Sequence, residues 1–156
     1  FPWHDSMQPI AQNYLAVERS VVECAYAGCE TIWVVCHKDM QPLIRYRLGE
    51  WINDPVYLHR NHAPGPNEEA RRQIPIYYVP IHPKDRDKRD CLGWSVLYGA
   101  QSAYWMAKQI SKWLIPNKYY VSFPYGIYDP KLVREYRKTI SSERRFHDIR
   151  WKNHCF

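Results

Sequence analysis

The chain lacks several sequence signatures of membrane proteins and of common enzyme classes. It has no uninterrupted apolar run of about 18 residues, so we expect no membrane-spanning helix and no membrane partner. Only 6 of its 156 residues are glycine. None of them forms a Walker-type phosphate loop, a dinucleotide fingerprint or the nucleophile elbow of serine hydrolases. The sequence therefore gives no support for a function that depends on any of these three motifs.

Paired cysteine spacing is also missing. The five cysteines are an odd number without the pattern of a disulfide framework, which favours a reducing, cytoplasmic compartment. Two histidines at positions 59 and 62 have no cysteine pair nearby, so a structural zinc site is not expected. A catalytic pair of Cys36 and His37 is disfavoured, because neighbours along a strand point to opposite faces. We interpret the cysteines as mostly buried thiols.

Acidic residues are in the minority. The 22 lysines and arginines exceed the 16 aspartates and glutamates, which gives a net charge of +6 and indicates an anionic partner. Nucleotide phosphate, nucleic acid and an acidic protein surface all fit this charge. Residues 131–152 are densely basic with interleaved aromatics, a pattern that can bind single-stranded nucleic acid. A solvated helix face followed by a basic tail over 141–156 is the favoured interpretation of that stretch.

What the chain does contain is a regular alternation of helical and strand patterns. Its length and its 46% hydrophobic content fit one domain over 1–156. Apolar spacing and capping residues predict helices over 14–27, 39–51, 90–115 and 130–140, strands over 31–36, 74–81 and 119–123, and a short strand over 56–58. Such alternation predicts an α/β fold with a mostly parallel sheet and helices on its faces.

In such a fold the ligand crevice lies at the carboxyl ends of the parallel strands. Three loops are expected to meet there. They carry Lys38 after the first strand, a charged run of cations and aspartates over 82–90 after the second, and Asp129 after the third. The helix that begins near residue 91 would direct its free N–H groups toward an anion in the crevice. The alternative is that these are ordinary solvated loop residues.

The order of elements resembles the sugar-phosphate nucleotidyltransferases, the family of the NDP-sugar pyrophosphorylases. The stretches that carry the resemblance are MQPI at 7–10, YAGC at 26–29, TIWVV at 31–35, IYYV at 76–79, LGWS at 92–95 and residues 119–129. The resemblance covers most of the chain and is closest to divergent members in tailed bacteriophages. It implies a Rossmann-like three-layer sandwich.

The chain departs from the family at three signature positions. Gln8 stands where the family has a catalytic lysine, and Tyr125 stands where it has a metal-binding aspartate. The family's first strand and glycine-rich loop would precede Phe1, so we expect either a processed chain or a fragment truncated at its N-terminus. Asp129 is the carboxylate nearest to the lost aspartate, although it can also simply cap the helix that starts at Pro130.

The resemblance implies that the protein binds a nucleoside triphosphate and Mg²⁺ and transfers a nucleotidyl group to a sugar phosphate. On this hypothesis the roles divide as follows: Asp129 for the metal and catalysis, Lys38 for catalysis, Lys84, Arg86 and Lys88 for the phosphates, and Leu92 with Gly93 for the base. The rival hypothesis is a catalytically inactive basic module on the same fold, which binds nucleic acid or a virion or other protein partner. The sequence does not predict the oligomeric state.

Overall fold

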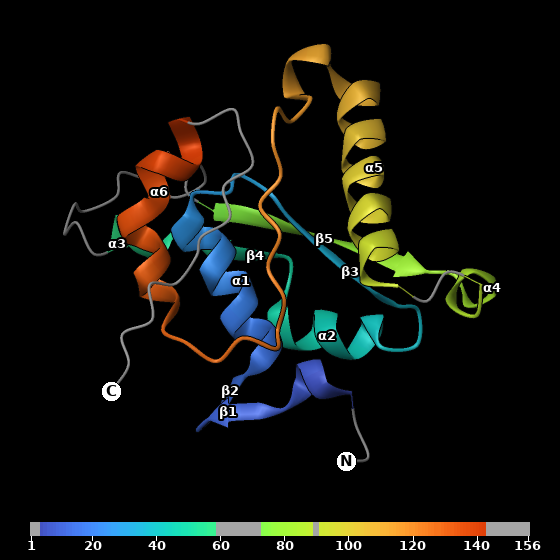
Figure 1. Ribbon diagram of the computed structural model, residues 1–156, viewed down its shortest axis with the longest axis horizontal. Coiled ribbons are helices and arrows are strands. Elements are labelled where there is room, and N and C mark those ends of the chain that lie inside the picture. The colour runs from blue at the N-terminus through green and yellow to red at the C-terminus, as the bar shows by residue number, and fades with distance from the viewer. Residues whose placement is uncertain (1–3, 59–72, 89–90, 143–156) are drawn as a thin grey trace.

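The computed structural model describes residues 4–58, 73–88 and 91–142. Its helices and strands follow in the order shown in Figure 1. The strands are β1 (Pro9–Ala11), β2 (Tyr14–Leu15), β3 (Ile32–His37), β4 (Trp51–Asn53) and β5 (Gln73–Ile81). The α-helices are α1 (Ala16–Ala27), α2 (Gln41–Leu48), α3 (Pro55–Leu58), α4 (Pro83–Arg86), α5 (Leu92–Ile110) and α6 (Val133–Ser142). Short 3₁₀ turns are η1 (Asp5–Met7), η2 (Lys112–Leu114) and η3 (Pro130–Leu132).

The strands form two small sheets. In the larger sheet the strand order is β3-β5-β4, with β5 parallel to β3 and antiparallel to β4. The register pairs Ile32 with Ile76 and His37 with Ile81. β1 and β2 form a separate antiparallel pair. The two apolar runs predicted as strands over 31–36 and 74–81 thus become the parallel pair. They are less buried than predicted, because Ile32 is the one buried residue of β3 and Tyr77 of β5 is exposed.

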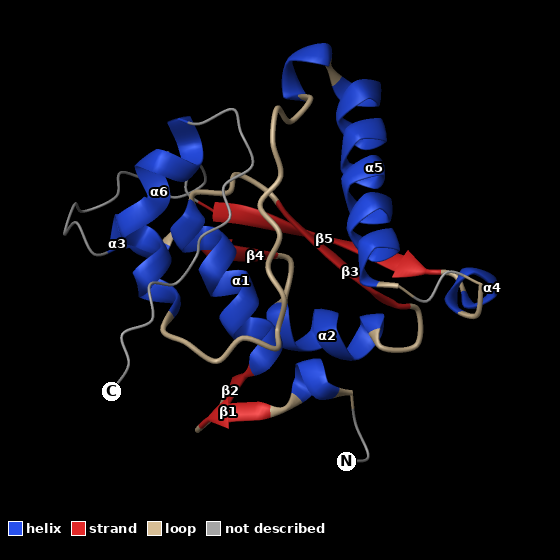
Figure 2. Ribbon diagram, viewed as in Figure 1, coloured by secondary structure: helices blue, strands red, loops and turns tan. Residues whose placement is uncertain are grey.

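The predicted Rossmann-like three-layer sandwich with a mostly parallel sheet is wrong. The larger sheet has three strands of mixed direction, and residues 119–123, predicted as a third parallel strand, pair with no strand in the described part of the chain. Figure 2 shows that segment as loop, running past the sheet. Its backbone is extended, but its alternate side chains at Tyr120 and Ser122 bind a buried carboxylate on α1, so those positions serve a polar contact instead of a sheet face.

α1 is the centre of the molecule. One side of it packs Val21 and Ala25 against Ile32, Ile74 and Ile76 of the sheet. Its C-terminal end packs Tyr26 and Ala27 against residues of α3 and α6 in a second cluster. Because a helix covered on two sides has no solvated face, nine of its twelve residues are buried.

α5 packs on the opposite face of the sheet from α1. Successive strand residues point to opposite faces, so Val34, which packs in the α1 cluster, and Val35 point apart. A Cβ on Gly99 of α5 would lie 2.6 Å from Val35 Cγ2. Glycine at 99 is therefore what lets the helix approach the sheet, and the contact is close and local.

Several local predictions are confirmed and others are wrong. α1 ends as predicted at Gly28, whose φ of 93° places it in the left-handed region. The predicted cap at Asp39 is wrong, because Met40 precedes α2 without a side-chain cap bond. Trp51 lies in β4 and not in the second helix, since Gly49 ends α2 first.

Two further differences concern short elements. The predicted strand over 56–58 is the helix α3, because Asp54 Oδ1 accepts the Val56 N–H at 2.9 Å and Pro55 fixes the first turn. The long helix ends at Ile110, with η2 following, and its N-cap is Cys91. The predicted cap at Asp90, the histidines at 59 and 62 and most of the basic tail over 141–156 lie outside the described residues.

Among the described residues, no helix combines the length and the apolar composition needed to cross a bilayer.

Candidate functional site

An ion pair lies buried on the side of α1 that faces away from the sheet. Arg19 and Glu23 stand one helical turn apart, with Arg19 Nη1 2.7 Å from Glu23 Oε2. The two residues are only 1% and 2% exposed. Buried charges of this kind require hydrogen bonds to their remaining polar atoms, because desolvation alone is costly.

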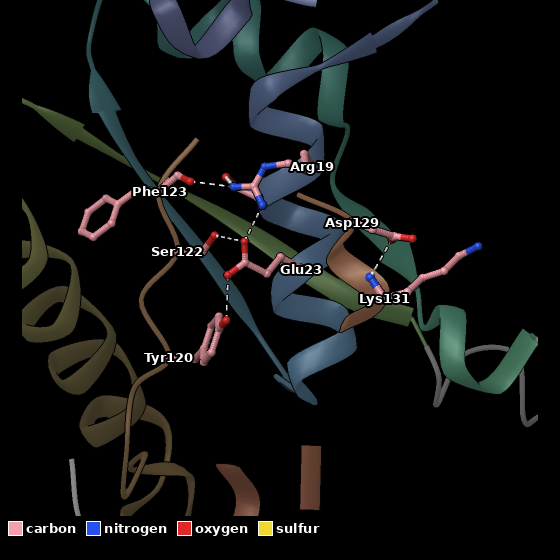
Figure 3. A network of polar contacts seen from close by, with 8 residues as sticks. Arg19, Glu23, Tyr120, Ser122, Phe123, Asp129 and Lys131 are labelled. Atoms are coloured by element: carbon pink, nitrogen blue, oxygen red, sulfur yellow. Dashed lines mark hydrogen bonds and ion pairs between the residues drawn. The ribbon is translucent and has the colours of Figure 1, made fainter. Parts of the chain in front are cut away.

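The segment that follows α5 supplies hydrogen bonds to both Glu23 oxygens and to Arg19 Nη2 (Figure 3), whereas Arg19 Nε has no partner among the described residues. The Tyr120 hydroxyl donates to Glu23 Oε1 at 2.7 Å, and the Ser122 hydroxyl donates to Glu23 Oε2 at 2.9 Å. Arg19 Nη2 donates to the Phe123 carbonyl at 2.7 Å, and its guanidinium lies 4.6 Å from the centre of the Tyr128 ring. One pair of charges on α1 therefore binds four positions of a segment about a hundred residues further along the chain.

The hydrogen bonds outweigh the burial of the carboxylate. Burial by itself raises the pKa of Glu23, but bonds from Tyr120, Tyr128, Arg19 and Ser122 bring that pKa below its ordinary value. Burial, together with the bond to Glu23, raises the pKa of Tyr120 and brings the pKa of Tyr128 to about 12. Glu23 is thus ionised and both phenols are neutral at physiological pH.

This network is suited to holding the chain in place and not to catalysis. The Glu23 carboxylate is saturated with donors and closed to solvent, so it has no free position for a substrate proton. The helical pattern of the sequence gave no sign of it. Arg and Glu four residues apart are typical of a solvated helix face, and only the packing of the segment turns them into a buried pair.

Anchoring one side of the segment leaves its other side open. From 119 to 130, burial alternates residue by residue, as expected for an extended chain lying on a surface. The inward positions include Tyr120 and Ser122. The outward ones are apolar: Tyr119, Val121 and Phe123 are half-exposed, and Tyr125 and Ile127 are exposed.

The C-terminal half of α5 is similarly uncovered. Ala103 is 5% exposed where the helix still lies on the sheet, whereas Ile110, two turns later on the same side, is 70% exposed. Figure 1 shows this half of α5 rising beyond the sheet, with η2 at its top and the following segment running back down. We call residues 104–123 the arm. Its helical part and η2 expose Tyr104, Trp105, Met106, Ile110, Trp113 and Leu114.

The arm is cationic as well as apolar. No aspartate or glutamate occurs anywhere from Cys91 to Tyr128. Lys108 Nζ lies 5.0 Å from the Trp105 ring centre and 5.9 Å from that of Tyr104. Lys118 binds the carbonyl oxygens of Ile140 and Ser141 at the end of α6, so it ties the arm to the body of the protein.

Most of the sequence-predicted site residues gather at one edge of the sheet. Lys38 follows β3, and Lys84 and Arg86 lie in α4 directly after β5, with Lys88 two residues further on. Leu92 and Gly93 open α5, whose first turn lies at the same end of the molecule (Figure 1). All six are exposed. Asp39, Asp85 and Asp87 lie among these cations, so the charge of the edge is mixed. The assignment of the cations to phosphates and of Leu92 and Gly93 to the base stays a prediction.

Asp129 lies elsewhere. It is the N-cap of η3, which leads into α6 at the opposite end of the molecule from α4 (Figure 1). Its Oδ1 accepts the Lys131 N–H at 2.9 Å, the capping role considered for it from the sequence (Figure 3). The structure therefore does not bring this carboxylate together with the cations at the sheet edge.

The two altered signature positions do meet. Gln8 and Tyr125 line one open hollow of about 270 Å³, beside Asp5, whose Oδ1 accepts the Gln8 amide at 3.2 Å. Ligand pockets are typically about 300–1,000 Å³. Asp5 is the one charged side chain that lines this hollow, and a carboxylate repels a triphosphate. Across the described residues, no group of three side chains suited to holding a metal ion is found.

In comparisons with known proteins, the chain matches no protein-family model, no curated protein sequence and no solved structure.

Proposed function

We propose that this protein is a binding module that docks on an acidic protein partner through its arm. The observation that carries the proposal is the exposure of α5, a 19-residue helix of apolar composition in which only Gly99 and Ala103 are buried. Helices that are apolar on all sides are normally enclosed. Contiguous apolar surface that is left open typically marks an interaction site.

The chemistry of the arm favours protein over nucleic acid. Aromatic side chains near lysines can stack on bases, and Trp105 with Lys108 would suit that use. Aliphatic side chains do not stack, however, and Ile110, Leu114 and Val121 are exposed among the aromatics. Burial of aliphatic surface together with tryptophan and tyrosine is typical of protein interfaces.

The charge of the arm indicates which kind of protein would bind to it. The arm carries lysines and no carboxylate, so a partner with acidic side chains around an apolar patch would complement it. A second copy of this chain would set one cationic arm against another, and the whole chain carries +6. Charge complementarity therefore favours an acidic protein over a second copy of this chain as the partner.

Selection from a random-peptide phage library against the full chain tests the proposal. We expect enriched peptides that combine apolar residues with aspartate or glutamate, and affinities that fall about tenfold or more when Ile110→Glu is introduced. Tyr46→Glu is the matched control, because Tyr46 is a 90% exposed aromatic residue on α2, outside the arm. It should leave the affinities unchanged.

Other results would overturn the proposal. Peptides that bind Ile110→Glu as well as the unchanged chain would place the interaction elsewhere. Binding confined to a single-stranded oligonucleotide, or to vesicles of anionic phospholipid, would assign the arm to nucleic acid or to a membrane surface.

Nucleotidyl transfer remains a second hypothesis. The meeting of Gln8 and Tyr125 in one hollow supports it, whereas the Asp5 carboxylate in that hollow opposes it. It predicts that a nucleoside triphosphate with Mg²⁺ raises the melting temperature, and that Asp129→Ala abolishes the rise. A panel of nucleotides without effect would count against it and leave the docking proposal untouched.

A further inference from the structure

Two cysteines meet at the end of α1. The Gly28 N–H donates to the Ala25 carbonyl at 3.1 Å, and the Cys29 N–H donates to the Cys24 carbonyl at 3.2 Å. With Gly28 in the left-handed region, these are the two bonds of a Schellman motif. In that motif the side chains at the positions of Cys24 and Cys29 frequently contact one another, and here both cysteines pack against the same core cluster.

The two thiols influence one another, and their surroundings differ. The neighbouring Cys29 thiol, followed by burial, raises the pKa of Cys24 well above its ordinary value. The Cys24 thiol lowers the pKa of Cys29, against the effect of burial, and the charge of Arg137 lowers it further. Cys29 is therefore the sulfur that ionises more readily.

Arg137 is held in position beside the turn. A Cβ on Gly28 would lie 3.0 Å from Arg137 Nε, so the side chain lies directly over the glycine. Its Nη2 lies 3.1 Å from Asp54 Oδ2, which fixes the guanidinium between α3 and the end of α1. Cys36 differs from Cys29, since burial is the one effect on its thiol and raises its pKa to about 11. A cation beside a partly exposed thiol is the usual setting of an oxidisable cysteine.

We propose that Cys24 and Cys29 form an oxidisable dithiol that closes a disulfide across the turn ending α1, with hydrogen peroxide as the oxidant. The pair is independent of the arm and of the docking proposal.

The chemistry balances with peroxide alone. The Cys29 thiolate attacks one peroxide oxygen, the O–O bond breaks, and a sulfenic acid and hydroxide form, the hydroxide leaving as water after protonation. The Cys24 sulfur then attacks the Cys29 sulfur and the S–O bond breaks. A second water departs with the Cys24 proton. Two thiols lose two electrons in total, and a thiol reductant such as dithiothreitol reverses the step.

Peptide mapping of the full chain tests the proposal. After peroxide treatment, free thiols are alkylated with a light reagent, disulfides are reduced, and the released thiols are alkylated with a heavy reagent. Cleavage after Glu23 and Glu30 isolates residues 24–30, which contain both cysteines and exclude Cys36. Without reduction this peptide should lose about 2 Da, the mass of two hydrogen atoms, and after reduction it should carry two heavy labels.

The expected pattern is specific. Cys36 should stay in the light form at peroxide concentrations about tenfold above those that oxidise the pair. Cys24→Ser should stop the reaction at a Cys29 sulfenic acid that a 1,3-diketone reagent traps, and Cys36→Ser should change nothing. Two results in the unchanged chain would overturn the proposal. One is that residues 24–30 still carry light labels, and so free thiols, at peroxide concentrations that oxidise Cys36. The other is a disulfide between Cys29 and a cysteine other than Cys24.

Discussion

Glu23 is the residue on which the polar interior depends. Its carboxylate neutralises Arg19 and receives the hydroxyls of Tyr120 and Ser122, so every strong polar contact between α1 and the extended segment passes through these two charges. Buried pairs are sensitive to the loss of one partner, because the other is left as an unpaired buried charge.

Glu23→Gln is therefore expected to destabilise the protein by about 3–5 kcal/mol, since it removes the charge that compensates Arg19. Denaturant unfolding measures the change. The double variant Arg19→Met/Glu23→Leu removes both charges and should lose much less stability than the single one. A single variant as stable as the unchanged chain would mean that the pair is not buried as described.

Glycines in α5 offer a second test at the residue scale. Gly99→Ala should cost about 1–3 kcal/mol, because the added methyl group meets Val35 at 2.6 Å and the helix must shift. Gly93 is the matched control in the same helix, with nothing within 4 Å of its Cβ position. Gly93→Ala should be neutral or stabilise by up to about 1 kcal/mol through helix propensity. Thermal unfolding of the two variants should separate them clearly.

At the scale of elements, the segment over 119–128 behaves as a clasp on α1 and not as a strand. Its backbone makes no ladder in the described residues, so its order depends on side chains. The bond from the Tyr120 hydroxyl to an ionised acceptor is of the stronger kind, about 1.5–3 kcal/mol.

Tyr120→Phe should therefore loosen the segment more than it loosens α1. Hydrogen exchange measured by mass spectrometry should show faster exchange over 119–128, with α1 amides changed less. Val121→Ala, next to it on the exposed side, serves as the control and should leave the exchange nearly unaltered. Equal acceleration across the whole molecule after Tyr120→Phe would contradict the clasp.

At the scale of the whole molecule, the network links stability to pH. The pKa of Glu23 lies lower in the folded protein than its ordinary value of 4.5, so the unfolded chain takes up the proton more readily as the pH falls. The stabilisation is fully present above pH 4.5 and is lost as the pH drops through the lower folded value. Melting temperatures from pH 7 to pH 3 should fall more steeply for the unchanged chain than for Arg19→Met/Glu23→Leu. If the melting temperatures of the two proteins fell equally with pH, carboxylates other than Glu23 would be responsible for the loss of stability in acid.

The molecule as a whole presents two surfaces of different character. Charged side chains of both signs gather at the carboxyl ends of β3 and β5, where sequence reasoning predicted a charged crevice. The apolar arm, which includes the C-terminal half of α5, rises beyond the sheet (Figure 1). The first could be predicted because parallel strands end at the same edge. The second could not, since the apolar spacing of α5 predicts one buried face and does not say where the sheet beneath it ends.

What the sequence determined by itself is local. The helical spacing, the glycine after Ala27 and the two apolar runs specify α1, α5, β3 and β5, because these features act over a few residues and depend on backbone preference and burial. The strand pattern of 119–123 was equally clear, yet it did not become a strand. The conformation of that segment depends on its hydrogen bonds to Arg19 and Glu23, about a hundred residues away. The burial of Arg19 and Glu23 depends in turn on the segment that covers them. Only the tertiary structure decides such mutual contacts, because the free energy of burying a charge is settled by the partners that surround it and not by its place in the chain.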